Sequence, residues 1–319
     1  MKLRIGHLST FYHTAILLMA NGRLQEDLGV DVEWRLFGTG PAIVAAFENG
    51  ELDIAYLGLP PALIGIDRGV DLICIAGGHI EGTVICGKNM YRGFPEVEDL
   101  GEILSQFRGE KIGVPGKGSI HDVILADSLL RHDLAGDIEV VNFSWSDQLT
   151  EAVVHDEVSA AFGTPALAAA LMYYAGGRVL YPPSLLWPNN PSYGILADSS
   201  FLQDSGVIVE KFLLQHEKAA SILRDHPRKA AETISRLVGF VDEGLVLEAL
   251  RISPKYCTKV TAGYISSTMA FAKVMKSMGY MKGEVSVQEV FDTGLIDKIH
   301  PEQDHYNIEK HEREEYKHA

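Results

Sequence analysis

The segment Lys2–Leu18, KLRIGHLSTFYHTAILL, reads as an apolar strand, a polar loop that contains a histidine, and an apolar helix. The segment Lys111–Leu125, KIGVPGKGSIHDVIL, has the same order, and its His121 corresponds to His13 of the first. Self-similarity at a long period indicates two copies of one folding unit. Because the two segments are not identical, chance similarity between two α/β segments is the alternative.

The similarity continues beyond these two segments. Asp31–Pro60 and Ile138–Pro165 each read as strand, polar turn, helix, acidic turn, strand and then Gly-x-Pro. A strand–helix–strand–helix–strand unit requires a parallel sheet with helices on its faces. Two units imply two lobes with a cleft between them, and ligands of such sheets bind beyond the carboxyl ends of the strands. The loops that both copies share are therefore the predicted site.

The sequence thus predicts an α/β fold of two lobes, each a mixed, mostly parallel sheet flanked by helices. Strands are expected near residues 3–8, 31–37, 52–57, 72–76, 83–86, 111–114, 138–142, 158–162 and 178–181. The first lobe is predicted at residues 1–84 and 195–302, the second at 85–194, and a polar, mostly solvated tail at 303–319.

The chain from Pro182 onward contains three stretches whose composition predicts their structure. Four prolines within Pro182–Pro191 argue against a helix and against a central strand, so this stretch is predicted to be the return loop. From Val207 onward the pattern is helical, and these helices are expected to pack on the first lobe. From Pro301 the chain is polar, which predicts a solvated segment.

Composition excludes several classes of function. The net charge of −15 leaves no basic stripe for nucleic-acid phosphates, and it disfavours binding to anionic membranes. No run of 18 apolar residues predicts a membrane span. The first 20 residues lack the apolar core of a signal peptide. The expected location is the cytoplasm as the sequence is written, or the periplasm or outside of the cell if a leader was removed.

The number and spacing of the cysteines indicate neither disulfide bonds nor a metal site. Cys74, Cys86 and Cys257 are too few and too scattered for a disulfide framework or a zinc site. Cys74 and Cys86 lie in apolar runs and are predicted to be core thiols. Four histidines near the C-terminus are expected to be solvated rather than metal-binding: His300, His305, His311 and His318. No cofactor is predicted.

In the first repeat, two loops carry candidate ligand-binding residues. Ser9, Thr10, Tyr12 and His13 follow the first strand and open a helix, where free backbone N–H groups attract anions. The hydroxyls of this loop also fit a purely structural role as helix N-caps. Thr39-Gly40 repeats the arrangement after the second strand, and the glycine permits close backbone approach to a ligand.

The second repeat offers a matching loop with a cation. Lys117, Gly118, Ser119 and His121 could together hold a carboxylate, sulfonate or phosphate, whereas a solvated lysine beside a capped helix is the structural alternative. Two short segments close the two repeats and are predicted to line opposite walls of the cleft: Leu59-Pro60-Pro61 and Gly163-Thr164-Pro165.

The segments that connect the lobes supply the remaining candidates. His79 and Glu81 lie where the chain leaves the first lobe, so we predict that they face the cleft and form part of the hinge. Trp187 and Asn190 lie near Asn189 and Tyr193, where the chain returns, and we predict that they cover a ligand. His13, His79, His121 and Glu81 could instead form a metal site, but no local ligand spacing supports one. The sequence contains neither a phosphate-binding loop motif nor a G-x-S-x-G motif, so nucleotide binding and hydrolase chemistry have no support.

Four stretches, FYHTAILLMANGRLQEDLGVDVEW, ENGELDIAYLGLPPALIGIDRG, KIGVPGKGSIHDVILADSLL and VQEVFDTGLIDKIHP, resemble the type II periplasmic binding proteins. More narrowly, the chain resembles the nitrate, alkanesulfonate and taurine solute-binding proteins of ABC importers and their thiamine-pyrimidine relatives. This resemblance implies a small ligand, anionic or heteroaromatic, that is bound between two closing lobes for an ABC transporter permease.

One branch of this family is enzymatic, and its thiamine-pyrimidine synthases carry a lysine and a histidine at the positions of Pro60 and Ile64. Both are absent here, and WPNNPSY at Trp187–Tyr193 has no cysteine where that branch is cysteine-rich. The resemblance therefore favours a binding protein over an enzyme. The alternative is a cytosolic enzyme or ligand sensor on the same scaffold, like the thiamine-pyrimidine or menaquinone-pathway relatives, with His13 or His121 as acid or base.

Overall fold

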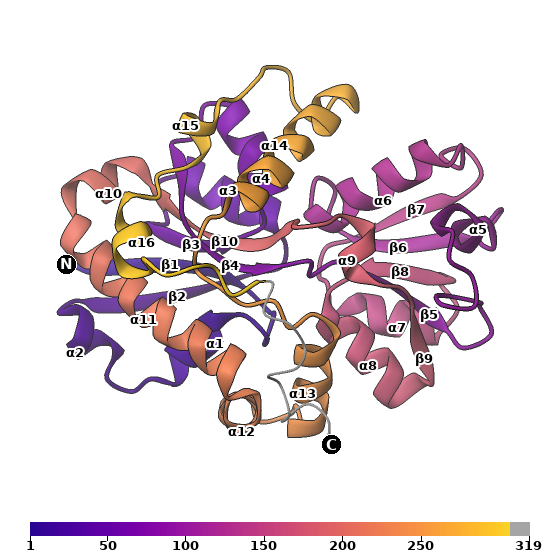
Figure 1. The fold of residues 1–319 in the computed structure, drawn as a ribbon, viewed down its shortest axis with the longest axis horizontal. Helices are drawn as coiled ribbons and strands as arrows, with labels where there is room; N and C mark the ends of the chain where they lie inside the picture. The colour runs from indigo at the N-terminus through magenta and orange to yellow at the C-terminus, as the bar shows by residue number, and fades with distance from the viewer. Residues whose placement is uncertain (307–319) are drawn as a thin grey trace.

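The computed structural model describes residues 1–306 and contains two five-stranded sheets flanked by helices (Figure 1). The first sheet has the order β2-β1-β3-β10-β4, and the second has the order β7-β6-β8-β5-β9. The strands of the first sheet are β1 (Lys2–Leu8), β2 (Asp31–Phe37), β3 (Ile54–Leu57), β4 (Leu72–Ile80) and β10 (Pro191–Asp198). Those of the second are β5 (Val84–Lys88), β6 (Lys111–Pro115), β7 (Glu139–Phe143), β8 (Ala160–Gly163) and β9 (Gly177–Tyr181).

The two sheets repeat one topology. β1 pairs in parallel with β2 and β3, and β6 pairs in the same way with β7 and β8. One strand in each sheet runs in the opposite direction: β10 lies between β3 and β4, and β5 lies between β8 and β9. The predicted fold of two mixed, mostly parallel sheets is therefore confirmed.

The helices connect these strands and cover the sheets. The first repeat contains α1 (Thr14–Ala20), α2 (Leu24–Leu28), α3 (Gly40–Glu48) and α4 (Leu59–Asp67), and the second lobe contains α5 (Leu100–Ser105), α6 (Ile120–Arg131), α7 (Gln148–Val154) and α8 (Pro165–Ala175). The remaining helices are α9 (Pro183–Leu186), α10 (Ser199–Asp204), α11 (Gly206–Asp225), α12 (Pro227–Val238), α13 (Glu243–Ile252), α14 (Ala262–Ser277), α15 (Val287–Val290) and α16 (Gly294–Ile299). Within residues 1–306, none of these helices has both the length and the apolar character that crossing a bilayer requires.

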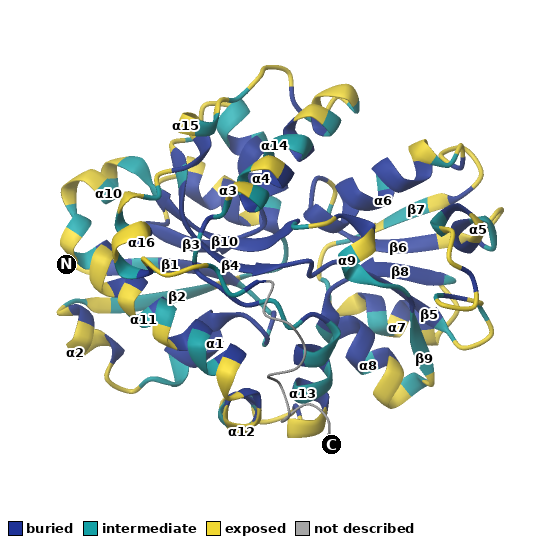
Figure 2. Cartoon of the chain, viewed as in Figure 1, coloured by how far each residue is buried: buried dark blue, intermediate teal, exposed yellow. Residues whose placement is uncertain are grey.

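The core of each lobe lies around its central strands. All residues of β3 and β8 are buried, as expected for parallel strands with helices on both faces, whereas the outer faces of the helices are exposed (Figure 2). Cys74 and Cys86 are buried within the sheets, as predicted. Burial raises the pKa of each of these two thiols to about 12, so both are neutral core groups.

The C-terminal half differs from the predictions in three ways. α11 and α12 pack on α1 of the first lobe, but α13 packs on α8 of the second lobe, so the C-terminal helices contact both lobes. Pro182–Pro191 contains the single turn α9, because Pro183 occupies the first helical position, where no N–H donor is needed. The predicted return to the first lobe at residue 195 falls inside β10, which begins at Pro191.

The segment after α16 is also more buried than predicted. His300 is 2% exposed, and Tyr306 is 2% exposed with its hydroxyl donating a hydrogen bond to the Cys257 carbonyl at 2.7 Å. The expectation of a solvated segment from Pro301, and of a solvated His300, is therefore wrong for these residues, because the segment folds back onto the first lobe. His311 and His318 lie outside the described residues.

Candidate functional site

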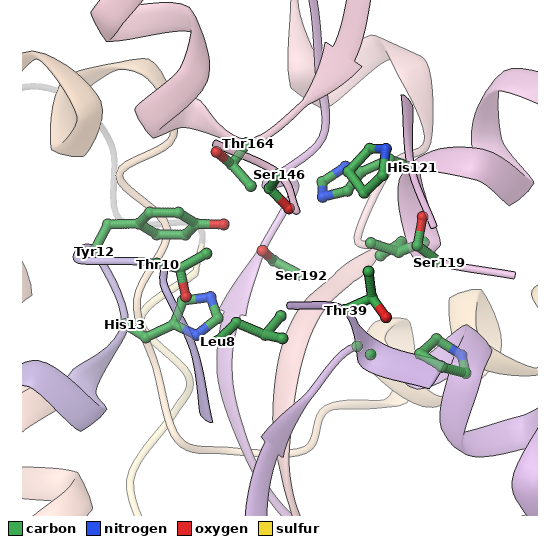
Figure 3. Close-up of a pocket in the computed structure, with 15 residues that line it drawn as sticks. Leu8, Thr10, Tyr12, His13, Thr39, Ser119, His121, Ser146, Thr164 and Ser192 are labelled. Carbon is green, nitrogen blue, oxygen red and sulfur yellow. The ribbon is translucent and has the colours of Figure 1, made fainter. Parts of the chain in front are cut away.

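A cavity with a volume of about 40 Å³ lies where the two lobes meet (Figure 3). Its walls are built at the carboxyl ends of the repeated strands: Leu8 ends β1, Gly58 follows β3, Pro115 ends β6 and Thr164 follows β8. This is the place where an open parallel sheet binds its ligands. The two repeats therefore face each other across one small chamber.

The N-cap residues of five helices line this cavity. They come from both lobes and are His13 of α1, Thr39 of α3, Gly58 of α4, Ser119 of α6 and Thr164 of α8. Each follows directly from a strand or a short loop, so its position is fixed by the sheet. The positive ends of these helices thus point toward the same small volume.

Some of these N-cap side chains have two roles. The Ser119 hydroxyl accepts a hydrogen bond from the Asp122 N–H at 3.2 Å, and the Thr164 hydroxyl accepts one from the Leu167 N–H at 3.2 Å. Thr39 makes no such capping bond. Capping and cavity lining are therefore compatible, since a hydroxyl that accepts from the backbone still has a proton to donate.

Two polar atoms in the cavity wall lack a hydrogen-bond partner. They are the Thr10 Oγ1 and the His13 Nδ1, both buried. The His13 ring packs on Tyr193, with ring centroids 4.0 Å apart, so it is held firmly in place. A buried polar atom without a partner costs roughly 1–3 kcal/mol. A molecule inside the cavity that bonds to these atoms would remove that cost.

The two histidines in the cavity wall are neutral at neutral pH. Burial lowers the pKa of His13 well below its usual value, with the neighbouring His79, His7 and His121 adding to the effect. Burial lowers the pKa of His121 to about 3, and the His121 Nδ1 lies 3.0 Å from the Thr83 hydroxyl. Both rings can therefore donate or accept a hydrogen bond without contributing a formal charge.

The residues that line the cavity include no lysine, arginine, aspartate or glutamate. Asp122, a buried carboxylate of the second lobe, accepts hydrogen bonds from the Gly118 N–H at 2.8 Å and the Asn142 amide at 3.0 Å. It also accepts one from the Tyr280 hydroxyl of the first lobe at 2.7 Å. Asp122 thus braces the loop at Ser119 and ties the two lobes together instead of facing the cavity.

The two lobes are in direct contact around the cavity. A Cβ atom added at Gly38 of the first lobe would lie 2.6 Å from the Ser144 carbonyl oxygen of the second. A Cβ at Gly116 of the second lobe would lie 2.9 Å from the Thr39 methyl of the first. The structure therefore represents a closed arrangement, in which the glycines at positions 38 and 116 leave room for the opposite lobe.

The structure brings eight of the predicted site residues together in the cavity wall. These are Thr10, Tyr12, His13, Thr39, Gly40, Ser119, His121 and Thr164. Ser9 and Gly118 belong to the same loops, and Leu59 and Pro60 begin α4, but none of the four lines the cavity. Lys117 is exposed and lies beside a separate surface groove, with its ammonium 6.0 Å from the centre of the Tyr280 ring.

Four predicted residues lie in the connection between the lobes and not in the cavity wall. Glu81 is buried, pairs with Lys255 at 2.7 Å and accepts from the Asn189 N–H at 3.0 Å, which links the two crossing segments. The His79 Nε2 lies 2.6 Å from the Ser253 carbonyl oxygen. Trp187 stacks on Phe271, and Asn190 donates to the Trp187 carbonyl at 2.7 Å. These contacts stabilise the segments that connect the two lobes, and they do not contribute to the cavity wall.

The alternative metal site at His13, His79, His121 and Glu81 does not form. Within residues 1–306, the side chains that gather closely enough to hold a metal ion are Cys257, His300 and His305. These are residues that the sequence spacing did not associate with one another.

The cavity wall also contains Pro61 and Ile120, which lie in predicted cleft segments, and five residues that the sequence did not single out: Leu8, Gly58, Pro115, Ser146 and Ser192. One of them had a usable signal, because Ser146 follows β7 as Thr39 follows β2 in the repeat. Ser192 lies in β10, whose place between β3 and β4 the repeat does not predict. Burial raises the pKa of the Tyr12 phenol, and the nearby Ser192 hydroxyl opposes that shift.

Comparison with known proteins identifies relatives. A family model described as the NMT1-like family matches residues 1–238. A Brucella abortus protein named "putative binding protein" is 24% identical over 267 residues, which cover 82% of this chain and 71% of that protein.

Solved structures resemble the fold. The alkanesulfonate-binding protein SsuA from Xanthomonas axonopodis pv. citri, bound to MOPS, matches with a TM-score of 0.77 at 19% identity, covering 91% of this chain and 98% of that one. The periplasmic nitrate-binding protein NrtA from Synechocystis matches with a TM-score of 0.74 at 14% identity, covering 94% and 88%. These likenesses confirm the two-lobed architecture.

Proposed function

Because the chain belongs to the NMT1-like family, we propose that it is a solute-binding protein that holds a small anion in the cavity between its lobes. The observation that carries this proposal is the pair of unpartnered polar atoms in the cavity wall, the Thr10 Oγ1 and the His13 Nδ1. The likeness of the fold to alkanesulfonate- and nitrate-binding proteins supports the same class of function. The partner that we propose is the permease of an ABC-type importer.

The chemistry of the wall favours an anion over a cation. Five helix N-termini contribute partial positive charge, and hydroxyl and imidazole groups supply hydrogen-bond donors. No carboxylate in the wall is available to hold a cation. The volume of about 40 Å³ suits a compact group, such as the head of a sulfonate or an inorganic oxyanion.

The enzymatic alternative has less support from the site. An efficient general acid or base has a pKa near the operating pH, whereas burial lowers the pKa of His121 to about 3. The positions where the enzymatic branch carries lysine and histidine hold Pro60 and Ile64. The wall residues are therefore suited to binding a solute without transforming it.

A ligand screen tests the proposal. The purified protein is analysed by native mass spectrometry and then by thermal shift with nitrate, bicarbonate, alkanesulfonates and pyrimidines. At 100 times its dissociation constant, a ligand should stabilise the protein by about 2.7 kcal/mol. Recovery of a stabilising anion unchanged is the expected result. A pyrimidine as the stabilising compound would reassign the ligand class, and a chemically altered product would overturn the binding role.

A pair of matched variants locates the ligand. His121→Ala removes an imidazole from the cavity wall and should weaken binding of the stabilising anion about tenfold, roughly the value of one hydrogen bond to a charged group. Lys117→Ala removes the nearby exposed cation and should leave the affinity within about twofold. Isothermal titration calorimetry measures both. A larger loss in Lys117→Ala than in His121→Ala would place the ligand in the outer groove.

A further inference from the structure

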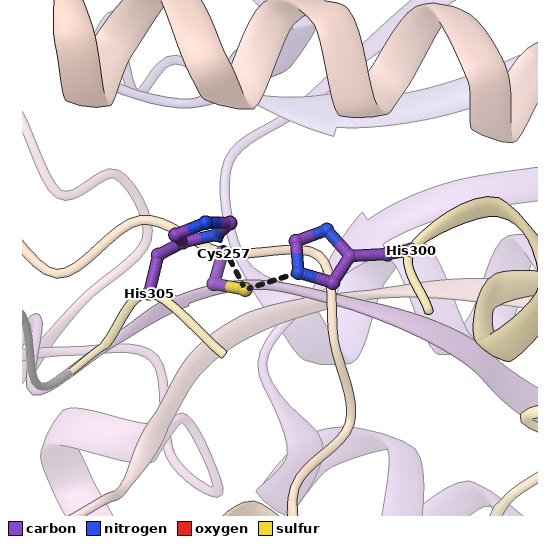
Figure 4. Close-up of side chains that lie close together, drawn as sticks. All are labelled: Cys257, His300 and His305. Atoms are coloured by element: carbon purple, nitrogen blue, oxygen red, sulfur yellow. Dashed lines mark hydrogen bonds between the residues drawn. The ribbon is translucent and has the colours of Figure 1, made fainter. Parts of the chain in front are cut away.

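A second cluster of ligand atoms lies in the first lobe, outside the interlobe cavity (Figure 4). The Cys257 Sγ lies 3.8 Å from the His300 Nε2 and 3.7 Å from the His305 Nδ1. All three ligand atoms lie within 4.8 Å of one another. Cys257 follows the segment that bridges to β4, and the two histidines come from the segment after α16. Residues far apart in the chain thus present two nitrogens to one sulfur.

The two sulfur–nitrogen distances fit a tetrahedral zinc site, and the two nitrogens, which lie within 4.8 Å of each other, would have to approach to about 3.3 Å when the metal binds. Zinc binds a thiolate sulfur at about 2.3 Å and an imidazole nitrogen at about 2.0–2.1 Å, which places the sulfur about 3.6 Å from each nitrogen. The observed separations of 3.8 and 3.7 Å are close to that value. A thiol alone has one proton and can donate to only one of the two rings. A metal ion between the three atoms engages all of them at once.

Contacts outside the cluster hold the His300 ring in position. The His300 Nδ1 lies 3.1 Å from a Glu217 carboxylate oxygen, and the Thr258 hydroxyl donates a hydrogen bond to the same carboxylate. With the Nδ1 proton directed to Glu217, the Nε2 lone pair of a neutral His300 is directed toward Cys257. A carboxylate that receives the second N–H of a ligating histidine is a regular feature of zinc sites.

We propose that Cys257, His300 and His305 bind one zinc ion, at a site independent of the solute-binding cavity. Binding replaces the thiol proton of Cys257, which leaves to solvent, with a bond from the thiolate to the metal. The three protein ligands leave the fourth position to water. The proposal reverses the expectation that these residues do not bind metal, since their spacing in the sequence gave no sign of their meeting.

The position of the site suggests what the metal does. The Cys257 N–H donates to the Gly78 carbonyl of β4 at 3.3 Å, so the cysteine is attached to the edge strand of the first sheet. Tyr306 is attached to the same segment through its hydroxyl. A metal ion bound to His300 and His305 would therefore fasten the segment after α16 to that edge. Such a metal contributes directly to the stability of the fold.

Without metal, the existing contacts of His300 also hold its ring in place. Its Nδ1 lies 3.1 Å from the Glu217 carboxylate, and its Nε2 lies 3.2 Å from the Gln303 carbonyl oxygen. A zinc titration measures whether the three proposed ligand atoms bind a metal instead.

The test uses the full chain after treatment with a chelator and dialysis. Zinc chloride is titrated with a competing chromophoric chelator, and cobalt chloride serves as a spectroscopic probe. We expect one equivalent of zinc, a higher unfolding temperature with zinc, and a cobalt–thiolate absorption band in the near ultraviolet. His305→Ala changes a partly exposed side chain and should weaken zinc binding at least tenfold. Cys257→Ser should remove the cobalt–thiolate band.

Matched controls separate this site from others. His155→Ala changes an exposed histidine of the second lobe and should leave zinc affinity unchanged. Glu217→Gln should weaken zinc binding by about tenfold, which is the usual effect of removing a carboxylate behind a ligand. His121→Ala tests the cavity and should also leave zinc affinity unchanged, so failure of the anion-binding proposal would not affect this result. Zinc binding that is absent, or equal in His305→Ala and the unaltered protein, would overturn the proposal.

Discussion

Gly38→Val should lower the affinity for the cavity ligand at least 100-fold while both lobes stay folded. The three atoms nearest to an added Cβ all belong to the second lobe, and the Ser144 carbonyl oxygen is only 2.6 Å away. A backbone atom cannot move aside as the end of a flexible side chain can. Gly38 does not have a positive φ, so valine introduces no backbone strain within its own lobe. The clash therefore arises only when the lobes are closed.

The size of the effect follows from population arithmetic. The apparent dissociation constant rises in inverse proportion to the fraction of molecules that can adopt the closed state. A clash that costs about 2.7 kcal/mol in the closed state lowers that fraction about 100-fold. Calorimetry with the anion found by the ligand screen measures the affinity, and circular dichroism checks that both lobes are folded.

Gly136→Val is the matched control for this variant. Gly136 is exposed, has no atom within 4 Å of an added Cβ and does not have a positive φ. Its affinity for the ligand should equal that of the unaltered protein. Full affinity in Gly38→Val would show that ligand binding does not require the lobes to approach as they do in this structure.

The sequence repeat predicted most strands correctly, because each repeated strand is marked by a local pattern of apolar and polar residues. The strands of both repeats are short apolar runs followed by polar loops, and in the structure they lie within two residues of the predicted positions. β10 is different, because its place between β3 and β4 depends on pairing with residues far away in the chain. Its first residue is Pro191, the end of a proline-rich stretch, so no local signal marked the strand. Long-range pairing of this kind is not encoded in local periodicity.

The site was predictable to the extent that strand ends determine it. Thr39, Ser119 and Thr164 were found because a loop at the carboxyl end of a parallel strand must face the cleft. The direction of each side chain within a loop was not predictable, and Lys117 turns outward toward Tyr280. Glu81 forms an ion pair with Lys255 and does not line the cavity, and the spacing of the two residues in the sequence could not identify this pair. The same limit applies to Cys257, His300 and His305, whose meeting depends on the path of the chain after α14.

The free energy of unfolding should fall steeply on acidification, because the folded protein buries several neutral histidines. Burial lowers the pKa of His79 to about 4, of His121 to about 3 and of His216 to about 4. In the unfolded chain each has a pKa near its ordinary value of about 6.5. Below that pH the unfolded chain binds protons that the folded chain does not bind. Stability is therefore complete above pH 6.5 and falls as the pH drops toward 4.

The expected slope is large. Three histidines that protonate only on unfolding give a limiting slope of about 4 kcal/mol per pH unit, and because they are half protonated in the unfolded chain at pH 6.5, the loss between pH 6.5 and 4.5 is about 6 kcal/mol. That figure is comparable to the whole stability of an ordinary domain. Urea unfolding followed by circular dichroism at a series of pH values measures the slope. A free energy of unfolding that is constant over this range would contradict the prediction.

His216→Gln tests the origin of the slope at one residue. The His216 Nδ1 lies 2.9 Å from the Thr14 hydroxyl and the Nε2 lies 2.8 Å from the Gly77 carbonyl, and a glutamine amide offers a similar donor and acceptor without titrating. The variant should lose about 1.4 kcal/mol per pH unit from the slope, which is the contribution of one proton. His155→Gln, at an exposed position, should keep the full slope. Equal slopes in both variants would mean that His216 takes up its proton in the folded protein, and that the buried bonds to Thr14 and Gly77 do not hold it neutral.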